Sequence, residues 1–350
     1  MEAITALKGE RLLGCEYPII QAPMAGAQGS DMAIAVSNAG GLGSLPCAML
    51  SVDSMVSEIQ RIKEATDNPY NLNFFCHHET AYDEAQHEAW QKKLAPYFSE
   101  FGATPKSLPN SASRAPFSHA IADAIEAFLP PVVSFHFGLP DPELVQRVKS
   151  WGSKVLSSAT TLEEALWLEA RGVDGIIAQG VEAGGHRGMF LSNDITTQMG
   201  LFSLVSQLSQ SVKVPVIAAG GVASHQDMKA LLSLGAKGVQ VGTSYLLCDE
   251  SRISDGHRKV LQSKDAQHTA LTNVFTGRPA RSVVNRAMKE LQYMSPYAPD
   301  FPHASIEINQ LKALDAKQGG TNFASLWCGQ NPSGCRAISA YELTKQLAQG

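Results

Sequence analysis

Several features that would point directly to a partner or a compartment are missing from this 350-residue sequence. It has no run of Lys and Arg, and its net charge is −5, so it carries no electrostatic footprint for nucleic acid or for an anionic membrane. No stretch of about 18 apolar residues occurs, which argues against a membrane span. Residues 1–14 lack the unbroken apolar stretch of a signal peptide, so we expect a cytoplasmic protein.

Common catalytic signatures are also absent. The six cysteines form no Cys-x-x-Cys pair, so neither a zinc site nor a disulfide framework is indicated. There is no Gly-x-Ser-x-Gly and no His-Glu-x-x-His, and the predicted strand ends carry no paired carboxylates. Lys154 begins a predicted strand and none ends in a lysine, which disfavours a Schiff-base aldolase. Hydrolase and aldolase chemistry therefore lose their usual support.

The sequence does contain short apolar runs bounded by turn residues, with helical patterns between several of them. Strand and helix alternate, which predicts a parallel sheet. The eight predicted strands, with no second nucleotide-binding half, favour a closed (β/α)8 TIM barrel over an open doubly wound sheet. These strands are 17–21, 43–45, 70–75, 132–137, 154–158, 175–179, 214–219 and 238–242.

The spacing of the strands predicts how the α/β fold is divided. Residues 1–248 would form the barrel, since a barrel needs roughly 250 residues. Two long spacings predict insertions at the barrel mouth, near 76–131 and 180–213. Residues 249–350 are more than one closing helix requires. We expect them to form a partly helical extension that, with the insertions, makes a smaller second domain covering the active face.

Glycine-rich turns follow the last two predicted strands, at Gly220-Gly221 and at Gly242-Thr243. Glycines allow the backbone to approach an anion closely, and this pair of loops is the usual phosphate site of such barrels. The alternative is that the glycines only form tight turns. We expect a phosphorylated ligand. Residues 21–26 and Asn73 could supply hydrogen bonds to the edge of a flavin and apolar or backbone contacts to the face of its ring. Asn73 could equally cap a turn.

The most specific segment follows the sixth predicted strand and reads Glu182-Ala183-Gly184-Gly185-His186-Arg187-Gly188. Small residues let this loop fold closely over a ligand and present the imidazole of His186. Histidine suits a general base because its ordinary pKa lies near neutrality. A structural histidine is the plain alternative, and His77 and His78 compete for the same role without a glycine setting.

With these residues, the sequence resembles the nitronate monooxygenase family, formerly called 2-nitropropane dioxygenases, and is most similar to its class I. The resemblance covers almost the whole chain. It rests on residues 18–24, 37–43, Asn73, 179–188, 219–221, 240–243 and 276–281.

The resemblance implies an FMN-dependent barrel with a smaller second domain. Members oxidise alkyl nitronates, notably propionate 3-nitronate, with O₂ through an anionic flavosemiquinone, and nitrite leaves. Its catalytic histidine is His186, the base for neutral nitroalkanes. No membrane or nucleic-acid partner is implied, and a homodimer is among the assemblies it allows. The implied FMN contacts are Ala22, Met24, Asn73, Gln179, Gly184, Gly221, Gln240, Gly242 and Thr243.

Two alternatives stay open. NAD(P)H-dependent flavin reductases, chiefly enoyl-acyl-carrier-protein and quinone reductases, share the phosphate loops and the glycine-flanked histidine. Arg187-Gly188 and residues 323–330 look more like the monooxygenase branch. A non-catalytic phosphometabolite-binding protein on the same barrel is the other reading, against which the intact loop around His186 argues. The sequence departs from the family pattern in residues 107–116 and at His77-His78, positions that could reshape the substrate pocket.

Overall fold

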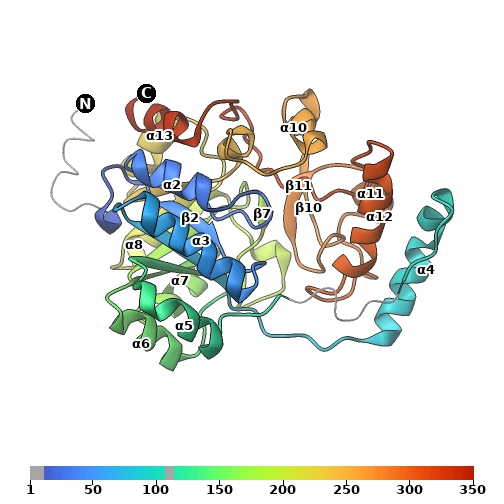
Figure 1. Ribbon diagram of the computed structural model, residues 1–350, viewed down its shortest axis with the longest axis horizontal. Helices are drawn as coiled ribbons and strands as arrows, with labels where there is room; N and C mark the ends of the chain where they lie inside the picture. Colours follow the sequence, from blue (N-terminus) through green and yellow to red (C-terminus); the bar gives the residue numbers. More distant parts are fainter. Residues whose placement is uncertain (1–11, 107–113) are drawn as a thin grey trace.

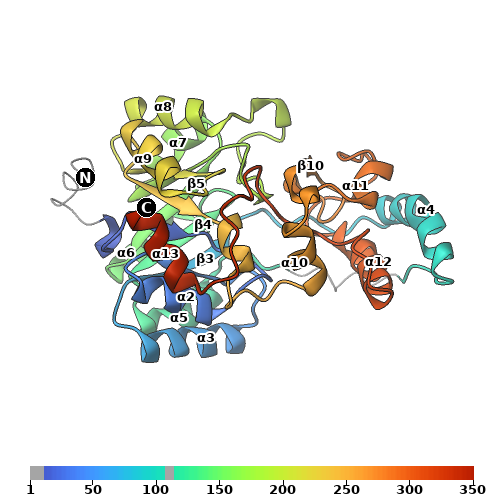
Figure 2. The same ribbon diagram turned by 90° about the horizontal axis from the view of Figure 1, so that it is seen from above.

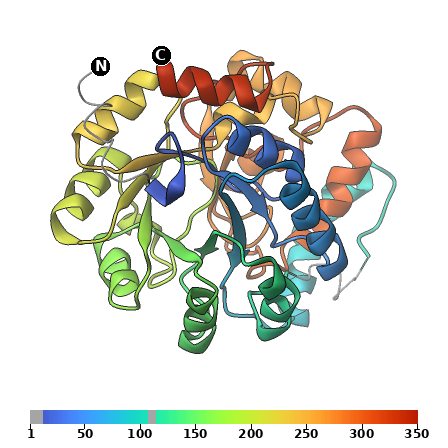
Figure 3. The same cartoon turned by 60° about the vertical axis from the view of Figure 1, so that its left-hand side comes forward.

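The computed structural model describes residues 12–106 and 114–350. Eight parallel strands in it form a sheet that closes into a barrel, seen almost end-on in Figure 3. Closure comes from a parallel bridge between Ile20 and Leu42, where the N–H of Gln21 donates to Leu42 O at 2.9 Å. The predicted barrel is thus confirmed, with a strand at each predicted position. In spatial order these strands are β1 (Ile19–Gln21), β2 (Gly43–Pro46), β3 (Tyr70–Phe75), β4 (Val132–His136), β5 (Lys154–Ala159), β6 (Gly175–Gln179), β8 (Val216–Ala219) and β9 (Gly238–Val241).

Helices surround this sheet (Figures 1 and 3). Several begin at a hydroxyl side chain that accepts a hydrogen bond from the N–H three residues on, as Ser51, Thr161 and Ser224 do, and such caps fix where a helix starts. The barrel helices are α2 (Ser30–Asn38), α3 (Val52–Ala65), α5 (His119–Ile125), α6 (Pro142–Ser150), α7 (Leu162–Glu169), α8 (Leu201–Ser211), α9 (His225–Ser233) and α13 (Ala340–Gln349).

The inside of the barrel is a packed apolar core and not a channel. Ile20, Leu42, Leu156, Ile177 and Ile217 fill it, and all are buried. Each such side chain contributes roughly 1.5–3 kcal/mol relative to exposure. This filling leaves the carboxyl ends of the strands as the place where a ligand can bind.

A second, smaller unit, here called the cap, stands over those carboxyl ends (Figures 1 and 2). Its antiparallel sheet has the order β10, β11, β7. The cap has its own core, which includes Trp90, Phe98, Met288, Leu311 and Phe323. This confirms the predicted second domain built from insertions and the C-terminal stretch. The cap elements are α4 (Glu84–Glu100), β7 (Gly185–His186), α10 (Asp255–Leu261), β10 (Thr269–Thr272), β11 (Ala280–Val283), α11 (Arg286–Glu290) and α12 (Ser305–Lys317).

Each insertion contributes to both units. The segment 76–131 supplies α4 to the cap and α5 to the barrel, and 180–213 supplies β7 to the cap and α8 to the barrel. The C-terminal stretch is likewise shared, because its last helix, α13, returns to pack against α2 and α9 of the barrel (Figure 2). The predicted boundary at residue 248, between the barrel and the C-terminal extension, therefore stays a prediction.

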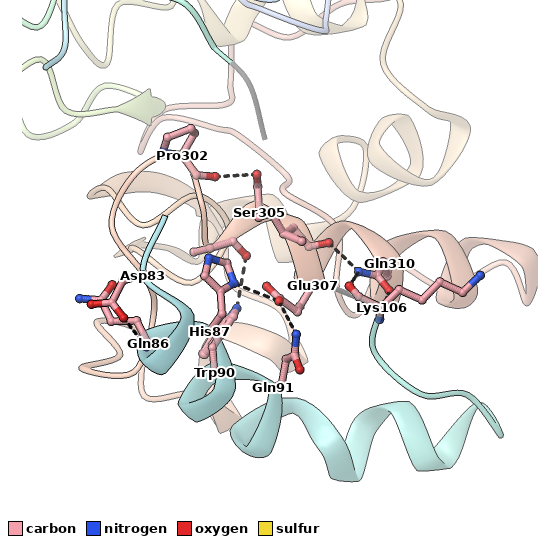
Figure 4. Close-up of polar contacts among 12 residues, drawn as sticks. Asp83, Gln86, His87, Trp90, Gln91, Lys106, Pro302, Ser305, Glu307 and Gln310 are labelled. Carbon is pink, nitrogen blue, oxygen red and sulfur yellow. Dashed lines mark hydrogen bonds and ion pairs between the residues drawn. The ribbon is translucent and has the colours of Figure 1, made fainter. Parts of the chain in front are cut away.

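Helices α4 and α12 of the cap are joined by buried polar contacts (Figure 4). His87 Nδ1 lies 3.0 Å from Glu307 Oε1, and both side chains are almost fully buried. Gln91 Nε2 donates to the same oxygen at 3.1 Å, and Trp90 Nε1 donates to Ala304 O at 3.3 Å. α12 is therefore held from the side that faces away from the barrel. Within the described part of the chain, no helix is long and apolar enough to cross a membrane.

Candidate functional site

A cavity of about 520 Å³ lies between the carboxyl ends of the barrel strands and the cap. All ten residues predicted as catalytic or FMN-binding line it. From the barrel side come Ala22, Met24, Asn73, Gln179, Gly184, Gly221, Gln240, Gly242 and Thr243, and His186 comes from β7. The structure thus brings the predicted site residues together, while their roles stay predictions.

One end of the cavity has the form of a phosphate cradle. Gly220 and Gly221 have φ of 131° and 69°, a region that favours glycine and turns their N–H groups around a tight bend. Thr243 Oγ1 accepts from Gly329 N–H at 2.9 Å, and Asn331 Nδ2 donates to Gly221 O at 2.9 Å. The loops after β8 and β9 are therefore fixed by a C-terminal segment, residues 329–331, that sequence inspection did not associate with them.

At the end of β9, the side chain of Gln240 carries an unpaired acceptor. Its Oε1 is buried and has no hydrogen-bond partner among the residues that the structure describes. A buried acceptor of this kind ordinarily has a partner, so a ligand N–H is the natural candidate. The phosphate cradle and this oxygen together fit an FMN-sized flavin.

His186 lies on β7 and its ring is enclosed by aromatic side chains. Phe301 and Trp327 each have ring centroids 5.5 Å from the imidazole. Its Nε2 is 2.9 Å from Thr276 Oγ1. Burial lowers the pKa of His186 well below its ordinary 6.5, and the positive charges of Arg114 and Arg278 act in the same direction. The imidazole is therefore neutral at pH 7 and can accept a proton.

The backbone around His186 is held by side chains at two strand ends. Gln179, at the end of β6, donates from Nε2 to His186 O at 2.9 Å and accepts at Oε1 from Gly188 N–H at 2.7 Å. His136, at the end of β4, lies with Nε2 3.3 Å from His186 O and Nδ1 3.1 Å from Ser158 Oγ. Since a carbonyl can only accept, His136 carries its proton on Nε2.

Arg187 anchors the same loop from inside the protein. It is fully buried, and its guanidinium donates to Gly180 O at 2.8 Å, to Gln179 O at 2.7 Å and to Gln198 Oε1 at 2.9 Å. Burial lowers its pKa to about 9, so it stays charged at neutral pH. The backbone N–H of Arg187 donates to Pro279 O at 2.8 Å, and this bond extends the pairing of β7 with β11.

The charged side chains that line the cavity are all cationic. They are Arg114, Arg252 and Lys312, and no Asp or Glu is among the described residues that line it. Arg252 is neutralised outside by Asp31 at 3.1 Å and Glu58 at 3.3 Å. Partial desolvation lowers the pKa of Lys312, and the positive charge of Arg114 lowers it further. The cavity is electrostatically suited to an anion.

Sequence reasoning missed several residues of this site. His136 had a usable signal, because it is a polar residue at the end of a predicted strand. Arg114 and Lys312 had none, because they come from a loop and from a helix of the cap. Thr276 begins the segment 276–281 on which the resemblance rests, but nothing in that segment indicated a contact with His186. Part of the divergent loop, residues 107–113, lies outside the described residues. His77 and His78 were the alternatives to His186 as the base. His77 is buried, with its ring centroid 4.9 Å from that of Phe301, and His78 is exposed. Neither lines the cavity.

Comparison with known proteins identifies the family. Residues 8–350 match the family model described as nitronate monooxygenase. The chain is 39% identical to a nitronate monooxygenase of Paraburkholderia phytofirmans, over 96% of this chain and 92% of the relative. It is 38% identical to a nitronate monooxygenase of Pseudomonas aeruginosa, over 97% of both.

Solved structures agree with this. A nitroalkane oxidase from Streptomyces ansochromogenes superposes with a TM-score of 0.87 at 37% identity, covering 99% of this chain and 96% of that one. FabK from Thermotoga maritima superposes with a TM-score of 0.71 at 25% identity, covering 98% and 94%. The chain belongs to the nitronate monooxygenase family of flavin-dependent oxidoreductases.

Proposed function

We propose that the protein binds FMN in the cavity beneath the cap and oxidises alkyl nitronates, propionate 3-nitronate among them, with O₂ and release of nitrite. The observation that carries this proposal is a partly buried His186, with its pKa lowered, in a cavity whose charged side chains are all cationic. A nitronate is an anion, and a neutral nitroalkane becomes one by losing a proton to a base. Membership in the nitronate monooxygenase family supports the same substrate class.

FMN would be held by residues of the barrel. The phosphate would lie at Gly221, Gly242 and Thr243, and the unpaired Oε1 of Gln240 would accept from the flavin ring. FMN supplies the one-electron chemistry that links oxidation of a nitronate to reduction of O₂.

His186 would act as the base for neutral nitroalkanes. The bond between the α-carbon and its hydrogen breaks, the proton passes to a ring nitrogen of His186, and the electron pair moves onto the nitro group. The aromatic rings around His186 exclude water, which strengthens the attraction between the resulting anion and nearby cations. For a nitronate supplied as the anion, this step is not needed.

Arg114 and Lys312 would interact with a carboxylate on the substrate. They lie on the cap side of the cavity, and no carboxylate lines the cavity among the described residues. Propionate 3-nitronate carries a carboxylate as well as the nitronate group, so it offers two negative charges to this site.

The test is an anaerobic absorbance spectrum of the purified, flavin-loaded protein mixed with propionate 3-nitronate, NADH or NADPH, followed by O₂ consumption and nitrite release in air. We expect the nitronate alone to change the flavin spectrum and to drive O₂ uptake. No O₂ uptake with any nitronate while flavin is bound would contradict the proposal.

A second candidate is an NAD(P)H-dependent flavin reductase. The similarity to FabK at 25% identity favours it over unrelated functions. Rapid anaerobic bleaching by NADH or NADPH, without a response to nitronate, would assign the protein to that class.

A further inference from the structure

Thr276 lies in the turn between β10 and β11, on the cap side of the cavity. Its hydroxyl is the hydrogen-bond partner of the His186 ring: the distance from Oγ1 to Nε2 is 2.9 Å. The same oxygen lies 3.4 Å from the backbone carbonyl of Arg278, to which it donates. The side chain is nearly fully buried, so water does not compete for these contacts.

The hydrogen-bond roles along this chain of atoms follow from the groups involved. A threonine hydroxyl has one proton, and a carbonyl oxygen can only accept. If the hydroxyl donates to Arg278 O, it must accept from His186, and the neutral imidazole carries its proton on Nε2. The lone pair of the ring then lies on Nδ1, for which no partner occurs among residues 12–106 and 114–350.

The opposite arrangement does not leave a usable base. If the Thr276 hydroxyl donated to Nε2 of His186, the lone pair of Nε2 would be occupied by that hydrogen bond. Nδ1 would then carry the ring proton, without an acceptor. We therefore propose that Thr276 is a positioning residue that fixes the tautomer of His186 and makes Nδ1 the atom that removes the α-proton of a neutral nitroalkane. This inference rests on the proposed function.

The proton transfer is simple in these terms. The α-carbon to hydrogen bond breaks, the proton forms a bond to Nδ1, and its electron pair becomes part of the nitronate. The ring is then an imidazolium, whose Nε2–H donates more strongly to Thr276 Oγ1. Because the His186 carbonyl is already held by Gln179 and His136, the remaining freedom of the residue lies in its ring. Thr276 restrains that ring.

The experiment compares Thr276→Val with Thr276→Ser in the flavin-loaded protein. Valine keeps the shape and removes the hydroxyl, whereas serine keeps the hydroxyl. Thr272→Val is the matched control, because Thr272 is equally buried and its hydroxyl donates to Tyr293 O at 2.7 Å, away from the cavity. Each variant is assayed with a neutral nitroalkane and with the preformed nitronate.

We expect Thr276→Val to lower kcat/KM for the neutral nitroalkane by about tenfold to 100-fold, the range observed when an outer-shell group that orients a metal-ligating histidine is lost. The nitronate should lose less than about threefold, and Thr276→Ser should restore most of the activity. Equal losses on both substrates, or no recovery with serine, would overturn the proposal.

A second measurement reads the tautomer directly. In ¹⁵N-histidine-labelled protein, the resonances of His186 are assigned by comparison with His186→Asn. We expect Nε2 to appear as the protonated nitrogen and Nδ1 as the unprotonated one in the wild type and in Thr276→Ser, but not in Thr276→Val. A protonated Nδ1 in the wild type would refute the assignment of the base. If the wild type oxidises neither substrate, the proposed function fails, and the tautomer is still decided by this spectrum.

Discussion

Gln179 holds the segment of His186 much as a neighbouring strand would. Its carboxamide accepts from Gly188 N–H and donates to His186 O, which are the contacts that a peptide group of a paired strand makes. The resemblance predicts that Gln179 contacts FMN, and the structure adds a second use for its side chain. An amide in this place connects the end of a barrel strand to the residue proposed as the base.

Replacing Gln179 tests this connection. Gln179→Glu keeps the acceptor for Gly188 N–H but places a carboxylate oxygen against the carbonyl of His186. Leaving such groups unpaired costs about 1–3 kcal/mol, so we expect kcat/KM for neutral nitroalkanes to fall roughly fivefold to 150-fold. Flavin content of the purified protein should change little. Loss of flavin with full activity after reconstitution would instead indicate that Gln179 serves FMN alone.

The lowered pKa of His186 predicts a particular pH profile. The base is active when it is deprotonated, and burial moves its protonation well below pH 6.5. With a neutral nitroalkane, kcat/KM should therefore stay constant from pH 8 down to 6.5 and decline only in more acidic solution. Initial rates with freshly dissolved nitroalkane measure this. A decline centred at or above pH 6.5 would contradict the assignment of His186, with its lowered pKa, as the base.

At the scale of elements, α12 is important because its two sides do different things. Ile308, Asn309 and Lys312 line the cavity, while Glu307 on the other side is buried against His87 of α4. The position of the cavity wall thus depends on a polar contact that touches no ligand. No local sequence pattern indicates this pairing, because residues 87 and 307 are far apart in the chain.

Glu307→Ala should loosen this wall. The change leaves His87 Nδ1 and Gln91 Nε2 without the oxygen they contact, and leaving a buried polar group unpaired costs about 1–3 kcal/mol. We expect a lower urea midpoint and a KM for propionate 3-nitronate raised about tenfold, with a smaller change in kcat. Glu88→Ala, on the exposed side of α4, is the control and should change neither quantity. An unchanged KM in Glu307→Ala would show that α12 is fixed by other contacts.

The barrel elements could be predicted from sequence one by one, whereas the cap could be predicted only as a smaller, partly helical unit without its strand pairing. A buried parallel strand such as β6 is a continuous apolar run between turn residues, which is a local signal. β7 is two residues long and exists because Ala280 and Arg281 pair with His186 and Gly185. No local pattern encodes a pairing across more than 90 residues. For the same reason the glycine-flanked histidine was identifiable, but its contact with Thr276 was not.

For the whole molecule, the buried histidines predict sensitivity to acid. Burial, with smaller contributions from neighbouring charges, lowers the pKa of His77 to about 4, of His136 to about 3 and of His257 to about 4. In the unfolded chain they would titrate near 6.5. Between these values the unfolded state binds more protons, so stability is lost as pH falls below about 6.5, by up to about 1.4 kcal/mol per pH unit for each histidine.

His77→Phe should reduce this dependence. Phenylalanine keeps the packing against Phe301 and removes the titrating group. The free energy of unfolding, measured in urea from pH 7 to pH 4.5, should fall less steeply than in the wild type by about 1 kcal/mol per pH unit. His78→Phe, at the exposed neighbouring position, should leave the slope unchanged. Equal slopes in the wild type and in His77→Phe would mean that His77 is protonated in the folded state as readily as in the unfolded chain.

The pairing of β7 with β11 has a mechanical consequence. The strand that carries His186 belongs to the sheet of the cap, whereas the residues proposed to hold FMN belong mainly to the barrel. The distance between the proposed base and the residues proposed to hold FMN therefore depends on how the cap sits on the barrel, and Gln179 and His136 restrain that distance by holding the carbonyl of His186 from the barrel side. In this architecture, substitutions at contacts between the cap and the barrel can alter proton abstraction by the proposed base without replacing a residue that lines the cavity.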